Sequence, residues 1–260
     1  MKILVTGHKG FIGSVVYADL QKEHDVYGFD IGSTFDDRRY DLIVHLAART
    51  LIRKSKELPY EYFQDGLGLT MKFVEKARKD KTPIIFPTSG SISEPSNPYS
   101  LAKKNAVEWI NLYRKLYGID AYILKFYNIY GPTSKKGAVY LFTKAAIDGE
   151  NVVVYGDGSH KRDFVHVNDI SKIIRRIADK EIAPGDYDVG SGKPTSVLEL
   201  LSLVESISGK KLQVAYRDYI LDEAESLYAK DNGVLDKYVD LKDGVRDVYM
   251  HLLNEKKRDI

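Results

Sequence analysis

The chain has 260 residues, no cysteine and a formal net charge of +2. This length can bury a sizeable core, while the lack of cysteine excludes disulfides and thiol catalysis, and the scattered Lys and Arg residues form no basic tract for nucleic acid. No apolar run approaches the roughly 18 residues of a membrane span, and a strand-like segment begins directly after Met1, so we expect a cytoplasmic protein without nucleic-acid or membrane partners.

Apolar periodicity predicts alternating strands and helices along most of the chain. The predicted strands are 2–6, 25–30, 41–46, 83–87, 120–126, 152–154 and 186–189. The predicted helices are 11–23, 59–80, 98–117, 138–148, 168–180 and 196–208. Alternation of this kind predicts an α/β fold with a doubly wound parallel sheet, covered by helices on both faces.

A glycine-rich segment joins the first predicted strand to the first predicted helix. Residues 5–13 read Val-Thr-Gly-His-Lys-Gly-Phe-Ile-Gly. Gly7 permits a tight turn, Gly10 lets the backbone approach a pyrophosphate, and Gly13 lets the helix pack on the strand. The free N–H groups at the start of the helix favour an anion. The segment therefore predicts a dinucleotide site, with an ordinary strand–helix turn as the alternative.

Asp30 ends the second predicted strand, about 20 residues beyond the glycine loop. An acid at this place accepts hydrogen bonds from the adenosine ribose and repels a 2′-phosphate, so NAD is favoured over NADP. Lys9, Arg38 and Arg39 act in the opposite direction, because cations could bind that phosphate. A simple turn aspartate is the alternative role for Asp30.

A second motif places Tyr99 four residues before Lys103 in the predicted helix 98–117. At this spacing the phenol and the ammonium lie on one helix face. A nearby cation favours the phenolate, so the tyrosine could transfer protons nearer to neutral pH than its ordinary pKa of about 10 allows. In isolation the pair would be read as a solvated helix face. Together with the glycine loop it indicates hydride transfer to and from a nicotinamide dinucleotide, with a tyrosine that moves the proton.

These segments resemble the extended short-chain dehydrogenases/reductases, in the group of NAD-dependent sugar-nucleotide epimerases and dehydratases that includes UDP-glucose 4-epimerase-like enzymes. The resemblance covers residues 1 to about 205 and continues weakly to about 250. Asp65 departs from it, because the family has an asparagine there, and the regions 31–40 and 93–98 are shorter than in relatives. The matching segments are Thr6–Gly13, His45–Ala48, Pro59–Phe63, Thr88–Gly90, Asn97–Lys103, Lys125–Pro132, Tyr155–Gly158, Arg162–Asp169 and Tyr187–Gly192.

The resemblance implies a Rossmann-type NAD-binding domain over residues 1–130, which also receives later segments such as 152–170. It implies a smaller C-terminal α/β lobe for the substrate, mainly 131–260, without a sharp boundary. Lys103 would lower the pKa of Tyr99 and hold the nicotinamide ribose, and Ser89 would bind the reacting oxygen, with Thr88 and Ser91 as alternatives. The implied catalytic residues are Ser89, Tyr99 and Lys103, and the implied cofactor contacts are Gly7, Gly10, Phe11, Ile12, Gly13, Asp30, Leu46, Ala47, Ala48, Tyr99, Lys103 and Tyr127.

The substrate implied by the resemblance is a nucleoside-diphosphate sugar. Asn128 matches the family asparagine that meets the phosphates, and Arg162 matches the arginine that clamps the pyrophosphate, a task suited to a forked cation. The alternatives are a turn asparagine and a surface salt bridge, and Tyr127 could equally be a core aromatic. We interpret His45 and His166 as structural, and no spacing of His, Asp and Glu predicts a metal.

The residues after Ser89 bear on the type of reaction. The 4,6-dehydratases of the group carry an Asp-Glu pair there to eliminate water, whereas this chain has Gly90 and Ser91. A 4-epimerase needs only oxidation at C4, rotation of the ketosugar and reduction on its other face, which makes it the favoured hypothesis. An NAD(P)H-dependent 4-reductase or epimerase-reductase and a non-catalytic NAD-binding regulatory protein stay open.

The resemblance also implies a homodimer formed through the helices 59–80 and 98–117. The second helix carries more apolar residues than one sheet-facing stripe needs. The alternative is that all of them pack inside the subunit. The apolar residues of the helix 98–117 on which this expectation depends are Trp109, Ile110, Leu112, Tyr113 and Leu116.

Overall fold

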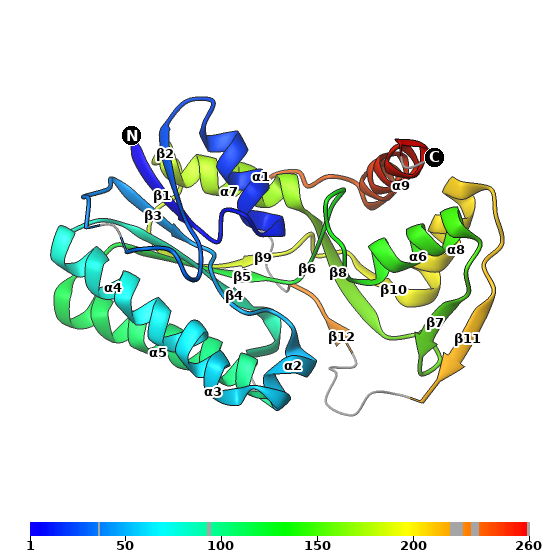
Figure 1. Ribbon diagram of the computed structural model, residues 1–260, viewed down its shortest axis with the longest axis horizontal. Helices are drawn as coiled ribbons and strands as arrows, with labels where there is room; N and C mark the ends of the chain where they lie inside the picture. The colour runs from blue at the N-terminus through cyan, green and yellow to red at the C-terminus, as the bar shows by residue number, and fades with distance from the viewer. Residues whose placement is uncertain (36, 93–94, 219–225, 230–233, 259–260) are drawn as a thin grey trace. The chain divides into compact units, whose positions relative to one another are not determined.

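The computed structural model describes residues 1–35, 37–92, 95–218, 226–229 and 234–258 of the chain. The chain forms two compact units, each assembled from two stretches of sequence (Figure 1). The first unit contains Met1–Phe126 and Ile170–Asp188, and the second contains Tyr127–Asp169 and Val189–Ile260. Among the described residues, no helix has the length and apolar character that crossing a membrane requires.

A six-stranded sheet in the order β2-β1-β3-β4-β5-β9 forms the centre of the first unit. Its strands are β1 (Lys2–Thr6), β2 (Asp25–Phe29), β3 (Leu42–His45), β4 (Ile84–Ser89), β5 (Ala121–Phe126) and β9 (Gly185–Val189). The pairings from β2 through β5 are all parallel. The strand order reverses between β1 and β3, and these two strands end level because Thr6 lies opposite His45. In open α/β sheets, such a reversal is where ligands bind.

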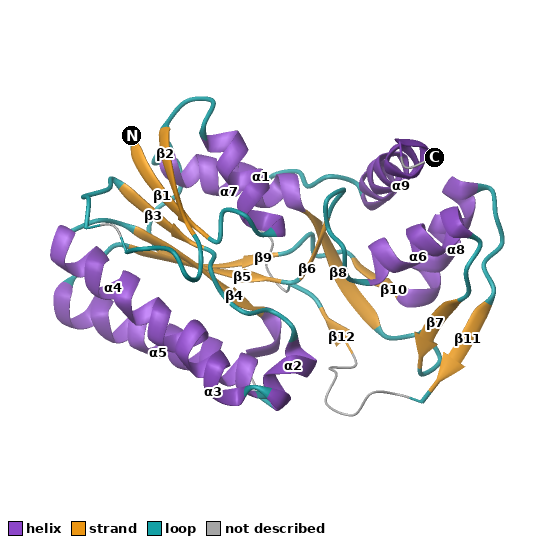
Figure 2. Ribbon diagram, in the orientation of Figure 1, coloured by secondary structure: helices purple, strands orange, loops and turns teal. Residues whose placement is uncertain are grey.

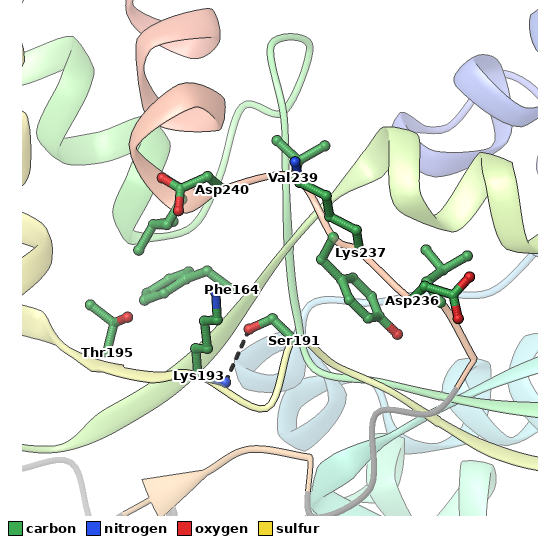
Figure 3. A pocket seen from close by; sticks show the side chains of 11 residues that line it. Phe164, Ser191, Lys193, Thr195, Asp236, Lys237, Val239 and Asp240 are labelled. Carbon is green, nitrogen blue, oxygen red and sulfur yellow. Dashed lines mark hydrogen bonds between the residues drawn. The ribbon is translucent and has the colours of Figure 1, made fainter.

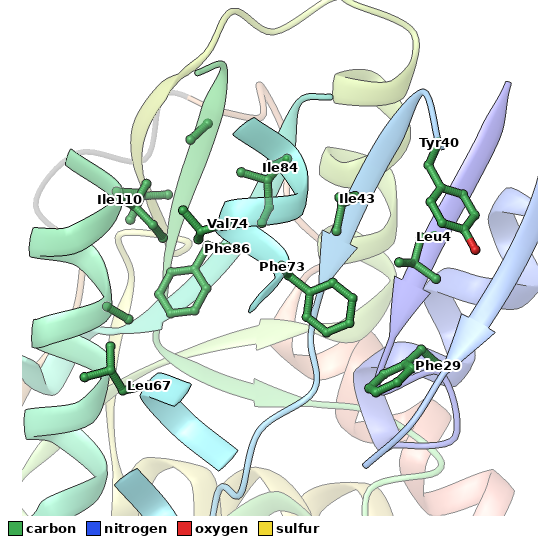
Figure 4. Close-up of a cluster of buried hydrophobic side chains, with 14 residues drawn as sticks. Leu4, Phe29, Tyr40, Ile43, Leu67, Phe73, Val74, Ile84, Phe86 and Ile110 are labelled. Atoms are coloured by element: carbon green, nitrogen blue, oxygen red, sulfur yellow. The ribbon is translucent and has the colours of Figure 1, made fainter. Parts of the chain in front are cut away.

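Helices cover both faces of this sheet. The helices α4 (Leu69–Asp80) and α5 (Pro98–Tyr117) lie side by side on one face, while α1 (Phe11–Leu20) and α7 (Val167–Ala178) lie on the other (Figure 2). Because both faces are covered, the central strands are apolar along almost their whole length. The core between the sheet and α4 and α5 includes Phe29, Ile43, Phe73, Phe86 and Ile110 (Figure 4).

The helix predicted over 59–80 has the expected bounds, but it is not α-helical throughout. It consists of α3 (Pro59–Tyr62), a π-helical turn (Phe63–Gly68) and α4, and a further helix α2 (Ile52–Glu57) precedes it. Two glycines in the turn weaken the regular helix, and the Thr70 hydroxyl donates to the carbonyl of Gly66. A Cβ at position 66 would lie 3.1 Å from Cβ of Ala102 on α5. Close packing against α5 therefore accompanies the π-helical turn.

The second unit is organised around β8 (Lys161–His166), which pairs in parallel with β6 (Asn128–Tyr130) and β12 (Ser226–Leu227) and antiparallel with β10 (Pro194–Ser196). A separate parallel pair joins β7 (Val152–Tyr155) to β11 (Val214–Arg217). The helices α6 (Ala138–Asp148), α8 (Val197–Ser208) and α9 (Leu241–Arg258) supply most of its apolar core, with Phe142, Leu200 and Val245 in its interior.

The prediction that residues 152–170 return to the first domain is wrong. Among the described strands, β7 and β8 of this segment pair with strands of the second unit. The stretch that returns is Ile170–Asp188, which contains most of α7 and nearly all of β9. A hydroxyl–carboxylate hydrogen bond of 2.8 Å from Ser171 to Asp19 fastens α7 to α1. The apolar pattern of a segment predicts that it is a strand but not which distant strand it pairs with. The strand over 152–154 was therefore predicted, but the unit to which it belongs was not.

Candidate functional site

The glycine loop after β1 has a backbone that only glycine allows at two of its positions. Gly7 has a φ of +71°, and its N–H donates to the Phe29 carbonyl at 2.6 Å. A Cβ at position 7 would lie 2.8 Å from the backbone nitrogen of Ala47, and a Cβ on Gly13 would lie 2.0 Å from the Gly7 carbonyl oxygen. Gly7 therefore fits the tight turn predicted for it, whereas Gly13 allows the helix to pack closely on the loop that follows the strand, not on the strand itself.

Gly10 leaves the start of α1 accessible. It is the N-cap of this helix and supplies no side chain to the first turn. A Cβ at this position would meet, within 4 Å, only the Gly7 carbonyl oxygen, at 3.1 Å, so the surface above Gly10 is not filled by the fold. Uncapped N–H groups at a helix start attract an anion. The loop thus fits a pyrophosphate, and Phe11 and Ile12 occupy the first turn of the helix.

Asp30 stands directly after β2, beside this loop. The backbone N–H of Lys9 donates to its Oδ2 at 3.3 Å, and its own N–H donates to the Ser33 hydroxyl at 3.3 Å. The tertiary structure therefore brings the Asp30 carboxylate next to Lys9 of the glycine loop. This is the place where a ribose bound beside the loop would meet an acceptor.

Leu46 and Ala47, directly after β3, are hydrogen-bonded to the end of β1, where the strand order reverses. The Ala47 N–H donates to Thr6 Oγ1 at 3.0 Å, and Leu46 N–H donates to the Thr6 carbonyl at 3.2 Å. Leu46, Ala47 and Ala48 thereby follow the end of β3 alongside the end of β1. These bonds hold the backbone of the predicted cofactor contacts against the glycine loop, where Gly7 approaches Ala47.

His45 is structural, as the sequence indicates. It is buried, with Nδ1 2.8 Å from Thr6 Oγ1 and Nε2 3.0 Å from Thr70 Oγ1. Thr6 Oγ1 already accepts from Ala47 and Thr70 donates to Gly66, so the threonine proton goes to Nδ1 and the ring donates through Nε2. Burial, followed by the charge of Lys103, lowers the pKa of His45 to about 3. The ring is therefore neutral and has no free nitrogen for catalysis.

The three predicted catalytic residues come from β4 and α5 of the first unit. Ser89 is the last residue of β4 and lies opposite Phe126 of β5. Tyr99 lies in the first turn of α5, which begins at the cap Asn97, whose side chain accepts from the Ser100 N–H at 3.0 Å. The buried Lys103 donates from Nζ to the Pro87 carbonyl at 2.8 Å. The helix thus reaches the strand two residues before Ser89.

The pKa values in this group differ from the sequence-based expectation. Burial raises the pKa of Tyr99 to about 12, with a smaller contribution from Tyr62, although part of the Tyr99 residue remains exposed. Burial also lowers the pKa of Lys103 to about 8. The expected lowering of the Tyr99 pKa by Lys103 is therefore wrong for this arrangement. The ammonium is held at the Pro87 carbonyl and over the Phe86 ring, 4.4 Å from its centroid.

The predicted substrate residues belong to the second unit. Asn128 is the first residue of β6 and Arg162 lies on the neighbouring β8, where Asn128 faces Phe164 in register. Both side chains are partly exposed, and Arg162 Nη1 donates to the Lys161 carbonyl at 3.0 Å. Tyr127 immediately precedes β6 and begins this unit. The structure thus brings Asn128 and Arg162 onto adjacent strands.

His166, on β8, packs in the second unit, edge to face with Tyr130 at 5.2 Å between ring centroids. Its Nδ1 accepts from the Asn168 N–H at 3.3 Å. Burial lowers its pKa, and the nearby Asp247 opposes this shift. These contacts support the structural interpretation of His166.

One buried residue of the second unit was not predicted. Asp163 accepts the Ser191 N–H at 2.8 Å, the Ser191 hydroxyl at 2.6 Å, the Gly192 N–H at 3.0 Å and the Ala229 N–H at 3.2 Å. A Cβ on Gly190 would lie 2.4 Å from Asp163 Oδ2. The sequence signal was its place beside Arg162, but the four donors come from residues far along the chain. Asp163 therefore fixes the loop 190–192 to the strand of Arg162.

A pocket of the second unit opens beside this loop (Figure 3). Ser191 and Lys193 lie at one side of it, joined by a 3.2 Å hydrogen bond from the Lys193 N–H to the Ser191 hydroxyl. Phe164 and Thr195 contribute from β8 and β10, and residues 235–241 complete the lining. The pocket adjoins the Asp163 cluster and was not predicted.

Comparison with known proteins assigns the family. A model described as the NAD dependent epimerase/dehydratase family matches residues 3–190. The chain belongs to this family. The NAD dependence of the family agrees with Asp30 beside the glycine loop, so NAD is the cofactor expected from the sequence and supported by the assignment.

Proteins with similar sequences align over three quarters of the chain or more. A putative UDP-glucose 4-epimerase of Methanocaldococcus jannaschii is 28% identical and aligns over 98% of this chain and 99% of its own. A UDP-glucuronate 4-epimerase of Thermodesulfobacterium geofontis is 27% identical, over 75% of this chain and 66% of its own. The Thermus thermophilus UDP-glucose 4-epimerase, solved in complex with NAD, has a TM-score of 0.86 at 24% identity and covers 96% of this chain and 98% of its own. This last similarity shows a shared fold.

Proposed function

We propose that the protein is an NAD-dependent 4-epimerase of a nucleoside-diphosphate sugar. The observation that carries this proposal is the hydrogen bond from Lys103, on the helix of Tyr99, to Pro87, two residues before Ser89 on β4, in the same unit as the glycine loop. Similar proteins named as UDP-sugar 4-epimerases support the substrate class. Gly90 and Ser91 follow Ser89 where the elimination of water would require acids.

The first unit would hold the cofactor along the reversal point of its sheet. Gly10 and the start of α1 would face the pyrophosphate, and Asp30 would face the adenosine ribose. Ala47 and Ala48 would contact the dinucleotide from the end of β3. NAD, when bound, supplies the hydride acceptor and donor that the side chains of this protein lack. The proposed role of the protein residues is to orient the sugar and to move its proton.

Tyr99 would take the proton of the sugar C4 hydroxyl and later return it. A phenol whose pKa is about 12 is protonated at neutral pH and cannot accept a proton, so its pKa must fall in the complex with substrate and cofactor for the phenolate to act as the base. Lys103 is the cation on the same helix face, and release of its ammonium from the Pro87 carbonyl toward the phenol would stabilise the phenolate. Ser89 would donate to the same sugar oxygen, and both steps of the epimerisation would use this one set of residues.

The second unit would bind the nucleotide end of the substrate. We assign Asn128 to the phosphates and the guanidinium of Arg162 to the pyrophosphate, because a fixed planar cation matches two phosphate oxygens. Asp163 would keep the neighbouring loop in place through its four hydrogen bonds. Remote binding of this kind allows the sugar to rotate while the nucleotide remains held.

A 4-reductase is the second candidate, and the cations near the adenosine ribose would favour it. Lys9 lies in the glycine loop, where its backbone N–H places it beside the Asp30 carboxylate, and the Arg38 guanidinium stacks 4.3 Å from the centroid of the Tyr27 ring. The Asp30 carboxylate opposes a 2′-phosphate. This arrangement supports NAD and the epimerase over an NADPH-dependent reductase.

We also propose a homodimer through α5 and the segment that contains α3 and α4. Ile110 is fully buried and Tyr113 packs at the edge of the core, so these two residues do not supply a free surface. Trp109, Leu112 and Leu116 remain 45%, 42% and 58% exposed. This row of large apolar residues supports a contact with a second copy.

The test of the proposed function is incubation of the purified protein with UDP-glucose, UDP-glucuronate, UDP-N-acetylglucosamine and other nucleotide sugars, read by NMR and mass spectrometry. An epimerase should equilibrate a sugar with its 4-epimer at constant mass and without net consumption of reduced cofactor. Reduction that consumes stoichiometric NAD(P)H would favour the reductase, and loss of water would favour the dehydratase. Binding of NAD without conversion of any sugar would indicate the regulatory alternative.

A further inference from the structure

His8 lies in the glycine loop against the carboxylate that we assign to the ribose. Its Nδ1 is 2.8 Å from Asp30 Oδ2, and the side chains are 22% and 23% exposed. The Lys9 N–H donates to the same oxygen. The His8 contact has the distance of an ion pair without the alignment of a hydrogen bond. Within the described part of the chain, both contacts go to Oδ2 and none to Oδ1.

The fold provides a dedicated space for this ring. Gly28 lies in β2, and a Cβ there would be 2.6 Å from Cγ, Cδ2 and Nε2 of His8. Glycine inside a strand usually weakens it and marks a close approach, and here the imidazole is the group that approaches. The Tyr17 ring of α1 also packs against it, with 5.2 Å between the ring centroids. Packing between β2 and α1 therefore directs the ring toward Asp30.

We propose that His8 is a positioning residue for the cofactor. It holds Asp30 with Oδ2 turned to the loop and leaves Oδ1 for the ribose hydroxyls of NAD. The proposal rests on the cofactor site described under the proposed function. Without the ring, the carboxylate can rotate and must be ordered when NAD binds, which costs affinity. NADP gains nothing from an ordered Asp30, because the carboxylate repels its 2′-phosphate. His8 therefore favours NAD selectively.

The test is calorimetric titration of the full chain with NAD and with NADP, together with the melting temperature of the free protein. His8→Ala should weaken NAD binding up to about tenfold, the scale of ordering one side chain on binding, and leave NADP within about twofold. His8→Asn keeps an N–H donor near the position of Nδ1 and should restore most of the NAD affinity. Gly28→Ala displaces the ring without removing it and should resemble His8→Ala.

Coupling between the two residues gives a second measurement. If His8 acts through Asp30, the double variant His8→Ala/Asp30→Ala should bind NAD about as well as Asp30→Ala alone. Equal losses for NAD and NADP with a lower melting temperature would show a structural role and overturn the proposal, and so would an unchanged NAD affinity in His8→Ala. A wild-type chain that binds neither dinucleotide would instead contradict the cofactor site itself.

Discussion

Lys103 donates a 2.8 Å hydrogen bond to the carbonyl of Pro87, and this bond ties the helix of Tyr99 to the strand that ends at Ser89. The ammonium that the sequence places beside Tyr99 is therefore engaged with the backbone of β4. The bond orients α5 over the sheet and keeps a cation buried at the end of β4. The protonation state of Lys103 therefore affects both the stability of the fold and the proposed catalysis.

Replacement of Tyr99 tests the proton transfer. Tyr99→Phe removes only the hydroxyl, so NAD affinity should stay within about twofold while turnover of the active nucleotide sugar falls at least about 100-fold, the lower range for loss of a general acid/base. Tyr117→Phe, at the exposed end of the same helix, should retain full turnover. Near-normal activity of Tyr99→Phe would show that another group carries the proton.

Lys103 should make stability depend on pH in the alkaline range. Burial lowers the pKa of Lys103 from 10.5 to about 8. Below pH 8 the folded chain therefore bears the cost of a buried charge. Between pH 8 and 10.5 the lysine is neutral in the folded chain but still protonated in the unfolded chain. The free energy of unfolding should therefore rise with pH, relative to Lys103→Met, by up to roughly 3 kcal/mol over this window. Urea titrations of both proteins across the window measure the difference, and parallel pH curves would contradict it.

Asp163 should be a major determinant of stability in the second unit. Asp163→Asn keeps the size but replaces an acceptor oxygen with an NH2 group, which opposes two of the four donors now bonded to the carboxylate. A loss of about 3 kcal/mol in the free energy of unfolding is expected. Asp243→Asn, at a 69% exposed side chain paired with Arg246, should cost less than about 1 kcal/mol. Similar losses in both variants would argue against the role assigned to Asp163.

The proposed dimer can be tested with charges on α5. Wild type should scatter light as a dimer at micromolar concentration, and Trp109→Glu combined with Leu116→Glu should give a folded monomer, because a buried unpaired charge opposes association. Leu141→Glu, at an equally exposed apolar residue of α6 in the second unit, is the matched control and should remain dimeric. A monomeric wild type would refute the assembly.

Several features could be predicted from the sequence because they depend on neighbours along the chain. The helix over 98–117 has the bounds expected, since Asn97 caps its start and Gly118, with a φ of +64°, ends it. The glycine loop follows β1 and precedes α1, and Asp30 follows β2, as expected. Spacing and local backbone preference are sufficient for such features.

Contacts between distant segments were decided only by the tertiary structure. The helix α9 was not predicted, because its sequence is largely polar and its buried residues Val245 and Val248 acquire their environment from the core of the second unit. The ring of His8 fits only because position 28, on another strand, is glycine. The pKa of Lys103 likewise follows from burial rather than from its spacing to Tyr99. Sequence patterns specify the elements and their ends, whereas burial, pairing partners and charge environments arise when segments remote in the chain exclude water from one another.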